Sequence, residues 1–220
     1  CINMTKQDAE YVLTQFKDAG IENILALRGD GIEGREPSCD FKHASELVEF
    51  IKQFDSKTGG TQFKVFGACY PERHPESEDV MSDIQGLKAK VDAGATHLIS
   101  QLFFDNEKFY RFLERAKLAG ITVPIEAGIM PATNKKSIER MVSLTNATLP
   151  PKFINMMERY GDSPEAIRDA GIAYAVDQIV DLVTNGVDGI HLYTMNNSYI
   201  AKRINEAVRS LFTVAPKDFV

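Results

Sequence analysis

A short repeat constrains the fold of this chain more than any other feature. Ala-Gly-Ile at 19–21, Ala-Gly-Ala at 93–95, Ala-Gly-Ile at 119–121 and Asn-Gly-Val at 185–187 each join a helical pattern of apolar residues to a short apolar run. A glycine just past a helix lets the chain turn back, because it adopts the left-handed conformation without steric cost. Ala-Gly-Ile at 170–172 is an exception, because it falls inside a long helical pattern. The repeat predicts helices that each return to a strand, as in α/β folds.

The apolar runs predict strands and the helical patterns predict helices. Five strands are expected, at 24–27, 63–69, 97–100, 123–127 and 189–193. Helices are expected within 5–20, 44–59, 80–94, 105–120, 135–144, 152–160, 163–186 and 200–211. This alternation suits a (β/α)8 TIM barrel or a doubly wound sheet, and no Gly-x-Gly-x-x-Gly motif selects the doubly wound sheet.

The first expected strand ends in a polar motif. The apolar residues 24–27 fit a strand that is buried on both faces, and Arg28, Gly29 and Asp30 follow at once. In parallel α/β folds, ligands bind at the carboxyl ends of strands. The alternative is a plain turn with solvated side chains. The long polar loop 31–40 makes the two interpretations about equally probable, because long loops in compact domains are often functional.

Bulk composition narrows the class of protein. The chain has 220 residues, of which 44% are hydrophobic, so we expect a single domain over 1–220 with a substantial core. The 25 Lys+Arg and 31 Asp+Glu residues give a net charge of −6 without a basic run, so nucleic acid is not an expected partner. No apolar run or leader indicates a membrane partner. Three widely spaced cysteines without a Cys-x-x-Cys pair predict a cytoplasmic protein.

Polar residues stand at the carboxyl ends of several expected strands. Besides Arg28 and Asp30, they are Tyr70, His74, Gln101, Asn134 and Tyr193. Each alone is more often structural, by roughly two to one, but together they predict a polar site. The sequence shows no zinc spacing, nucleophile elbow or phosphate-binding loop, and His97 and His191 fit core positions. Such a site suits chemistry that a bound cofactor performs.

Several motifs, in order along nearly the whole chain, together resemble the methylenetetrahydrofolate reductase family. They are Ala-Leu-Arg-Gly-Asp at 26–30, His-Ala-Ser-Glu-Leu-Val at 43–48, Tyr-Pro-Glu-Arg-His-Pro-Glu at 70–76, Leu-Lys-Ala-Lys-Val-Asp-Ala-Gly-Ala at 87–95, Gln-Leu-Phe-Phe-Asp at 101–105, Gly-Ile-Met-Pro at 128–131 and His-Leu-Tyr-Thr-Met-Asn at 191–196. Any one of these motifs would be weak evidence, but their succession is specific.

The resemblance implies a flavoprotein oxidoreductase. Its members are FAD-containing TIM barrels that take hydride from NADH or NADPH and reduce methylenetetrahydrofolate to methyltetrahydrofolate. The resemblance implies that Asp30 contacts both the flavin and the folate and acts in catalysis, and that Lys90 neutralises a pyrophosphate. The implied FAD-binding residues are Leu27, Arg28, Gly29, Asp30, Ala44, Tyr70, His74, Asp83, Lys90 and Ile99. The implied folate-binding residues are Asp30, Gln101, Tyr193 and Asn197, and Gln101 also matches a nicotinamide contact.

The chain departs from the family pattern at several positions. The family has an arginine for the glutamate tail of folate where this chain has Asn197, and Lys202 is a possible substitute. Ala89 stands where the family has an arginine for the flavin phosphate, and Ser137 where it has a folate-side glutamine. The proton-donating glutamate of the family ends the first barrel strand, and we expect it upstream of Cys1.

We therefore expect the C-terminal part of a TIM-barrel catalytic domain, with five to six of the barrel strands, in a homo-oligomer. Residues 1–220 alone should associate through unpaired sheet edges and lack activity. One alternative is a barrel module that binds flavin or folate without turnover, and a strand ending in glutamate upstream would argue against it. Another is an unrelated phosphate-binding barrel, for which every motif match would be coincidence.

Overall fold

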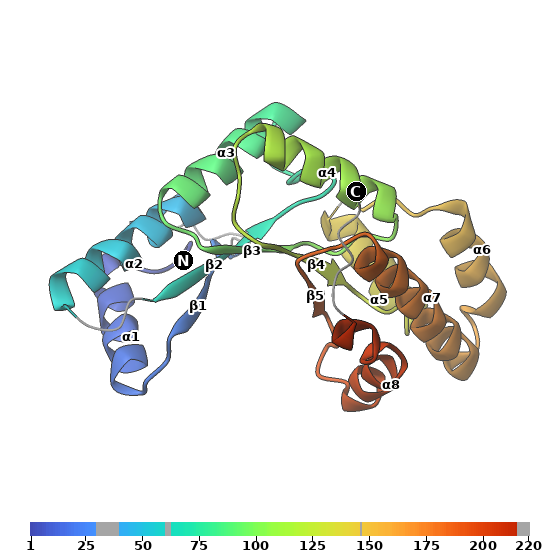
Figure 1. The fold of residues 1–220 in the computed structure, drawn as a ribbon. Helices are drawn as coiled ribbons and strands as arrows, with labels where there is room; N and C mark the ends of the chain where they lie inside the picture. Colours follow the sequence, from blue (N-terminus) through green and yellow to red (C-terminus); the bar gives the residue numbers. More distant parts are fainter. Residues whose placement is uncertain (30–39, 60–62, 146, 215–220) are drawn as a thin grey trace. The chain divides into compact units, whose positions relative to one another are not determined.

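The structure is a computed structural model that describes residues 1–29, 40–59, 63–145 and 147–214 (Figure 1). Asp30, Cys39, the rest of the loop 31–39 and the chain end from Ala215 lie outside the described residues. The strands are β1 (Asn23–Ala26), β2 (Lys64–Cys69), β3 (His97–Ser100), β4 (Ile125–Ile129) and β5 (Gly189–Leu192). The helices are α1 (Lys6–Asp18), α2 (Ala44–Thr58), α3 (Val80–Asp92), α4 (Asn106–Leu118), α5 (Lys135–Thr145), α6 (Pro151–Tyr160), α7 (Pro164–Thr184) and α8 (Ser198–Val208), with a short 3₁₀ helix at Leu211–Thr213.

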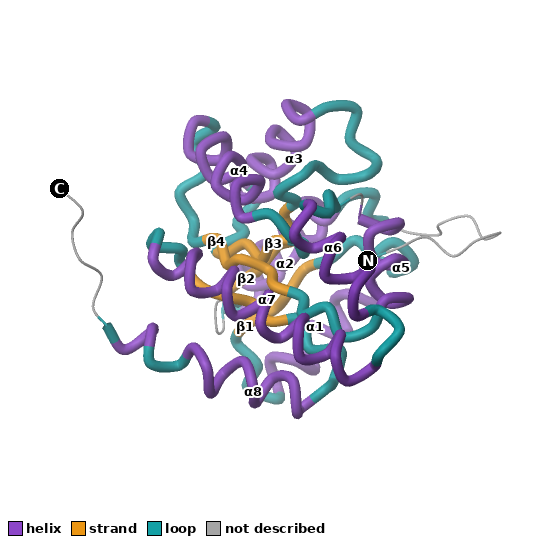
Figure 2. Tube along the Cα trace, turned by 90° about the vertical axis from the view of Figure 1, so that its right-hand side faces the viewer, coloured by secondary structure: helices purple, strands orange, loops and turns teal. Residues whose placement is uncertain are grey.

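The strands follow one another in the sheet in chain order, β1-β2-β3-β4-β5. β1 pairs with β2 in parallel, with Ile24 opposite Val65, and β4 pairs with β5 in parallel, with Gly128 opposite His191. Figure 2 shows the strands in orange and the helices that separate them along the trace in purple. The predicted alternation and the α/β class are confirmed. The glycines of the repeat, Gly20, Gly94, Gly120 and Gly186, all have positive φ, between 71° and 116°, as the predicted turns require.

The chain forms two compact units, each with its own helices and strands. Unit 1 comprises Cys1–Cys69, Glu78–Ile99 and Ala116–Pro124. Unit 2 comprises Tyr70–Ser77, Ser100–Arg115 and Ile125–Val220.

In unit 1, apolar residues of α1, α2, β1 and β2 form one core, in which Val48 and Val65 are fully buried. A capping box begins α1: the Thr5 side chain accepts from the backbone N–H of Asp8, and the Asp8 carboxylate accepts from the N–H of Thr5. Such a cap satisfies the first free N–H groups of a helix and stabilises it by about 1 kcal/mol.

The prediction that β1 is buried on both faces is wrong for the described structure. Ala26 is buried, but Leu25 and Leu27 are 45% and 44% exposed. β1 is the first strand in the order of the described sheet, where it pairs with β2. Alternate side chains of a strand point to opposite faces, and described residues cover the face that carries Leu25 only in part. A continuous apolar run therefore marked a strand correctly and its burial incorrectly.

In unit 2, the core joins the chain after β3 and β4 to α5, α6 and α7, with Phe104, Phe153 and Ile167 among its buried residues. The glycine inside α7 has a packing role. A Cβ at Gly171 would lie 1.9 Å from the carbonyl oxygen of Ala132, so only glycine lets the helix approach the segment after β4 this closely. The exceptional Ala-Gly-Ile at 170–172 is thus inside a helix, as predicted.

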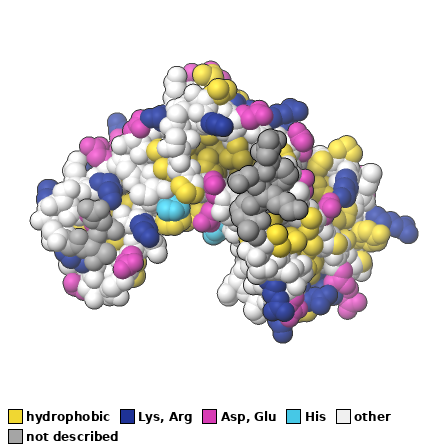
Figure 3. Space-filling model, viewed as in Figure 1, with side chains coloured by type: hydrophobic (Ala, Val, Ile, Leu, Met, Phe, Trp, Pro, Cys, Tyr) yellow, Lys and Arg dark blue, Asp and Glu magenta, His cyan; other side chains and the backbone are white. Residues whose placement is uncertain are grey.

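Charges of both signs are interspersed over the face drawn in Figure 3, on the surface of each unit. None of the described helices combines the length and the apolar character that a membrane crossing would require.

Candidate functional site

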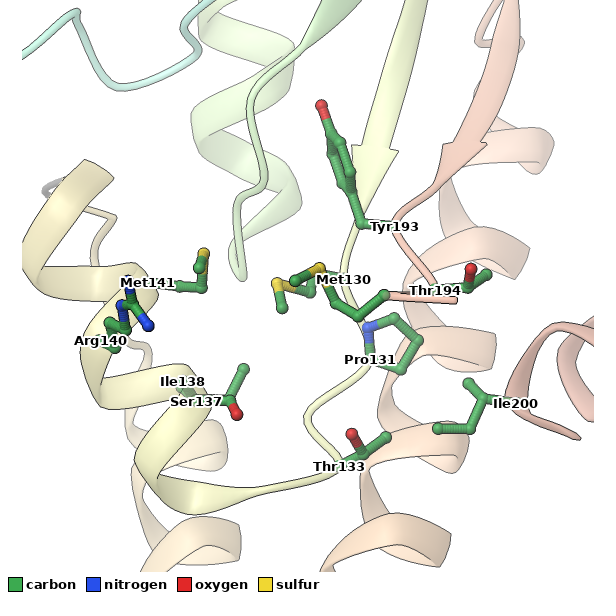
Figure 4. Close-up of a pocket in the computed structure, with 11 residues that line it drawn as sticks. Met130, Pro131, Thr133, Ser137, Ile138, Arg140, Met141, Tyr193, Thr194 and Ile200 are labelled. Carbon is green, nitrogen blue, oxygen red and sulfur yellow. The ribbon is translucent and has the colours of Figure 1, made fainter. Parts of the chain in front are cut away.

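A pocket opens in unit 2 at the carboxyl ends of β4 and β5 (Figure 4). Its volume is about 170 Å³. An engineered apolar cavity of about 150 Å³ holds a benzene molecule, so this pocket suits one aromatic ring. The lining residues come from the ends of the two strands and from α5 and α8: Met130, Pro131, Thr133, Ser137, Ile138, Arg140, Met141, Tyr193, Thr194, Met195 and Ile200.

A hydrogen-bonded group fixes the wall of the pocket that Tyr193 forms. The Tyr193 hydroxyl donates to the carbonyl oxygen of Ser100 at 2.9 Å. The fully buried Ser100 hydroxyl accepts from the backbone N–H of Gly128 at 2.8 Å and donates to the carbonyl oxygen of Gln101 at 3.0 Å. A Cβ at Gly128 would lie 2.1 Å from the Ser100 oxygen and 2.8 Å from the Tyr193 ring. Gly128 therefore makes room for the contact that holds Tyr193 in place.

Three methionines, Met130, Met141 and Met195, give the pocket an adaptable apolar lining. Methionine is flexible, and its sulfur makes favourable contacts with aromatic rings, worth about 0.3–1.5 kcal/mol each. Met195 and Asn196 both have positive φ, 49° and 60°, in a turn closed by a hydrogen bond from Asn197 N–H to the Thr194 oxygen at 3.0 Å. A methionine rarely adopts this conformation, and such strain clusters at functional sites.

In unit 1, the predicted flavin residue Lys90 reaches the end of β2. Its half-buried ammonium donates to the carbonyl oxygen of Ala68 at 2.5 Å. A Cβ at Gly67 would lie 2.7 Å from Lys90 Cδ, so this glycine leaves space for the lysine to cross the strand. Burial lowers the pKa of Lys90, and the nearby Asp83 carboxylate acts in the opposite direction. Burial raises the pKa of the neighbouring Cys69 thiol to about 12, so this thiol is a weak nucleophile.

The other predicted flavin residues of unit 1 lie at strand ends and at a helix start. The carbonyl oxygen of Arg28 accepts from the N–H of Ile2 at 2.7 Å. Gly29 has a φ of 81°, a backbone conformation that favours glycine. Ala44 begins α2, and Ile99 is a nearly buried residue of β3.

Two further predicted flavin residues lie together in unit 2. The rings of Tyr70 and His74 meet edge to face, with centroids 4.5 Å apart. Arg73, between them, has a φ of 98°, which is unusual for a residue with a side chain. Glu72 of the same segment accepts hydrogen bonds from the backbone N–H and the hydroxyl of Thr148. The segment is thereby held in a strained conformation.

Of the predicted folate residues that the structure describes, Tyr193 lines the pocket, and Gln101 and Asn197 do not. The amide oxygen of Gln101 accepts from the N–H of Leu102 at 2.9 Å. The side chain of Asn197 caps α8 by accepting from the N–H of Ile200 at 3.3 Å. Lys202 pairs with Glu206 at 3.9 Å and is also absent from the pocket lining.

The sequence patterns did not identify the pocket residues Met130, Arg140 and Met141 as a site. Met130 was part of the Gly-Ile-Met-Pro motif, and Met141 resembles any core residue of an amphipathic helix. A usable signal was present in the strand glycines Gly67 and Gly128, because a glycine inside a strand often marks the close approach of another group.

A family model for methylenetetrahydrofolate reductase matches residues 1–209. The chain belongs to the methylenetetrahydrofolate reductase family. The match covers unit 1, most of unit 2 and all the residues that line the pocket, and it confirms the resemblance carried by the motifs.

Relatives within the family include proteins of bacteria and plants. The chain is 35% identical over 205 residues to a 5,10-methylenetetrahydrofolate reductase of Escherichia coli (strain K12), with 93% of this chain and 66% of the relative covered. It is 34% identical over 209 residues to methylenetetrahydrofolate reductase (NADH) 1 of Arabidopsis thaliana, with 89% of this chain and 35% of the relative covered. The chain thus spans just under two thirds of the bacterial relative and about a third of the plant relative.

A solved structure shares the fold. It is described as an uncharacterized protein from Clostridium thermocellum that binds two copies of 5-methyl-5,6,7,8-tetrahydrofolic acid. The TM-score is 0.59 at 15% sequence identity, over 97% of this chain and 72% of that chain. At this identity the likeness shows a shared fold alone.

Proposed function

We propose that the protein to which this chain belongs reduces methylenetetrahydrofolate to methyltetrahydrofolate, with hydride from NADH or NADPH and with FAD as cofactor. The observation that carries the proposal is the ring-sized pocket at the ends of β4 and β5, in a chain whose family model covers residues 1–209. Folates contain an aromatic ring between a pterin and a glutamate tail, and this pocket matches a ring of that size.

On the folate side, the chain supplies an adaptable apolar wall and fixed polar groups. Met130 and Met141 would pack on the ring, and Tyr193 is held by its hydrogen bond to Ser100. The side-chain oxygen of Gln101 accepts a hydrogen bond from the backbone N–H of Leu102. The amide N–H groups of Gln101 are then the part of this side chain that would orient a ligand. A group held in this way orients its ligand with little loss of side-chain entropy.

On the flavin side, the described residues fit a cofactor that carries phosphates. Lys90 is half-buried with a lowered pKa, so its ammonium is desolvated and would gain from an anionic partner. The positive φ of Gly29 and the strained Arg73 between Tyr70 and His74 mark the other segments that we assign to flavin binding. The chemistry that FAD supplies when bound is hydride transfer between NAD(P)H and the folate. The residues of this chain bind and orient the reactants.

Asp30 is the residue of this chain to which we assign an electrostatic role in the reaction. It follows Arg28 and Gly29 in the family motif, and it lies outside the described residues. A carboxylate close to the flavin ring and the folate would stabilise positive charge that develops on the folate.

The test uses the intact natural protein that contains this chain. The absorption spectrum should show a noncovalent flavin, and NAD(P)H should reduce methylenetetrahydrofolate. Asp30→Asn should keep the flavin content and lower folate reduction by about tenfold to a thousandfold, the loss expected when an electrostatic contact of about 2–4 kcal/mol is removed. Asp18→Asn, a change of an exposed aspartate at the end of α1, is the matched control and should leave turnover unchanged.

Other outcomes separate the alternatives. A flavin-loaded protein that binds folate without turnover would favour a binding module. A protein that takes up neither ligand would overturn the proposal. Cytoplasmic location and assembly into a homo-oligomer stay predictions, which fractionation and light scattering of the natural protein would test.

A further inference from the structure

Arg140 is the one pocket-lining side chain, among the residues that the structure describes, that carries a charge at neutral pH. It lies on α5 and is exposed, with Ser137 one turn earlier on the same helix (Figure 4). Its backbone oxygen accepts from the Ser143 hydroxyl at 2.7 Å, whereas within the described part of the chain its guanidinium makes no hydrogen bond or ion pair. The pocket therefore combines an apolar interior with one cation that has no internal partner.

Neighbouring cations differ from Arg140 in this respect. Lys202 of α8 pairs with Glu206, and the stem of Lys135 lies against Gly161, where an added Cβ would meet Lys135 Cδ at 2.8 Å. Lys136 is exposed on α5 and does not line the pocket. Arg140 is thus the cation that a ligand in the pocket would meet.

The geometry favours a carboxylate as the partner. A guanidinium presents its N–H groups as a planar fork that matches a carboxylate with two parallel hydrogen bonds. The pocket volume of about 170 Å³ accommodates one ring, so a charged substituent of that ring has to leave the pocket across its rim. Figure 4 shows Ser137, Arg140 and Met141 on α5 along one side of the pocket and Ile200 on the opposite side. A ligand that suits this pocket has an aromatic ring with an anionic substituent directed toward α5.

We propose that Arg140 is a specificity-determining residue that binds the carboxylate on the ring substituent of the ligand. This inference rests on the proposed function, in which the ring is the benzoyl ring of folate and the carboxylates belong to its glutamate tail. The protein then prefers folates with a glutamate tail over pteroates, which have the same rings and no glutamate.

The test measures binding of two probes, 5-methyltetrahydrofolate and its tail-free counterpart 5-methyltetrahydropteroate, to the intact natural protein. Arg140→Gln should weaken binding of the folate by about tenfold, the loss expected for one charge-assisted contact at an exposed site, and change binding of the pteroate by less than about twofold. Arg140→Lys, which keeps the charge without the fork, should give an intermediate loss. The difference between the probes should shrink as salt is raised from about 0.02 M to about 0.5 M, because salt screens exposed charges.

Lys136→Gln is the matched control, since it removes a positive charge from the same helix at a position that does not line the pocket. It should leave the preference for the folate unchanged. An equal loss for both probes in Arg140→Gln, or an equal preference in Arg140→Gln and wild type, would overturn the role of Arg140 while leaving the proposed reduction intact. A wild-type protein that binds neither probe would overturn the proposed function together with this inference.

Discussion

The candidate ligand-binding residues of the two units differ in polarity and in whether they already have partners inside the chain. In unit 1, the candidate residues are polar groups that already have partners inside the chain, such as the Arg28 oxygen with the Ile2 N–H and the Lys90 ammonium with the Ala68 oxygen. In unit 2, the pocket is lined by methionines and other apolar side chains, and its charged residue Arg140 is unpaired within the described structure. The first arrangement suits fixed recognition of a charged group, and the second suits an apolar ring whose position can adjust.

A glycine-to-alanine substitution in each unit tests this contrast, and we expect it to have the largest effect on stability. Gly128→Ala places a Cβ 2.1 Å from the backbone oxygen of Ser100. This oxygen cannot move away without breaking its hydrogen bond with the Tyr193 hydroxyl. Gly67→Ala places a Cβ 2.7 Å from Lys90 Cδ, which belongs to a flexible side chain and can give way.

We expect Gly128→Ala to lower the free energy of unfolding by about 3 kcal/mol, as in severe overpacking, and Gly67→Ala by at most about 1 kcal/mol. At roughly 2–4 °C per kcal/mol for a chain of this size, the two melting temperatures should differ by several degrees. Urea denaturation of the intact protein measures both values. Equal stabilities of Gly128→Ala and Gly67→Ala would show that the backbone around Tyr193 can shift as easily as the side chain of Lys90.

The sequence predicted the elements of this fold well because their signals are local. A capping box, a proline at the start of a helix and a glycine after its end each act within a few residues, and the three occur at Thr5, Pro164 and Gly186. The burial of Leu25 could not be predicted, because it depends on what covers the strand and not on the strand itself.

The site was predicted in part for a related reason. Polar residues that follow strands, such as Tyr193, are easily distinguished from the apolar runs before them. Met141 instead has the spacing of a core residue, and Arg140 has the spacing of a residue on a solvated helix face. A pocket arises from residues that lie far apart in the sequence, so no local pattern marks them. The family motifs supplied roles for Lys90 and Gln101 that their spacing alone did not indicate.

A second prediction separates ligand binding from stability in unit 1. Lys90→Met keeps a long side chain and removes a charge whose desolvation lowers its pKa. Replacing a desolvated charge by an apolar side chain of similar shape is often neutral or stabilising, so the melting temperature of the flavin-free protein should stay the same or rise by a few degrees. Affinity for FAD, measured by flavin fluorescence, should fall by about tenfold, because a charge-assisted contact to phosphate is lost.

Lys88→Met is the control, because Lys88 lies on the same helix and its ammonium pairs with the Asp92 carboxylate at 2.5 Å. It should leave FAD affinity unchanged. A Lys90→Met protein that melts well below wild type and still binds FAD normally would show that Lys90 stabilises unit 1 and does not bind FAD. The proposed contrast between the two units would then lack its evidence from unit 1.

The smallest expected effect concerns Gln101, which belongs to unit 2 and does not line the pocket. Its side-chain oxygen accepts from the Leu102 N–H at 2.9 Å, so its amide N–H groups are the part of the side chain that we assign to ligand contact. Gln101→Ala should slow folate reduction several-fold more than NAD(P)H oxidation and move the melting temperature by no more than about a few degrees, because half-exposed polar residues contribute little stability. Gln101→Glu keeps the oxygen that Leu102 requires and replaces the N–H groups by a second acceptor. Stopped-flow kinetics of the two half-reactions in both variants decide between the roles: normal folate reduction in Gln101→Glu would mean that the bond to Leu102 is the whole function of this residue, whereas equal losses in both variants are expected if the N–H groups meet the folate.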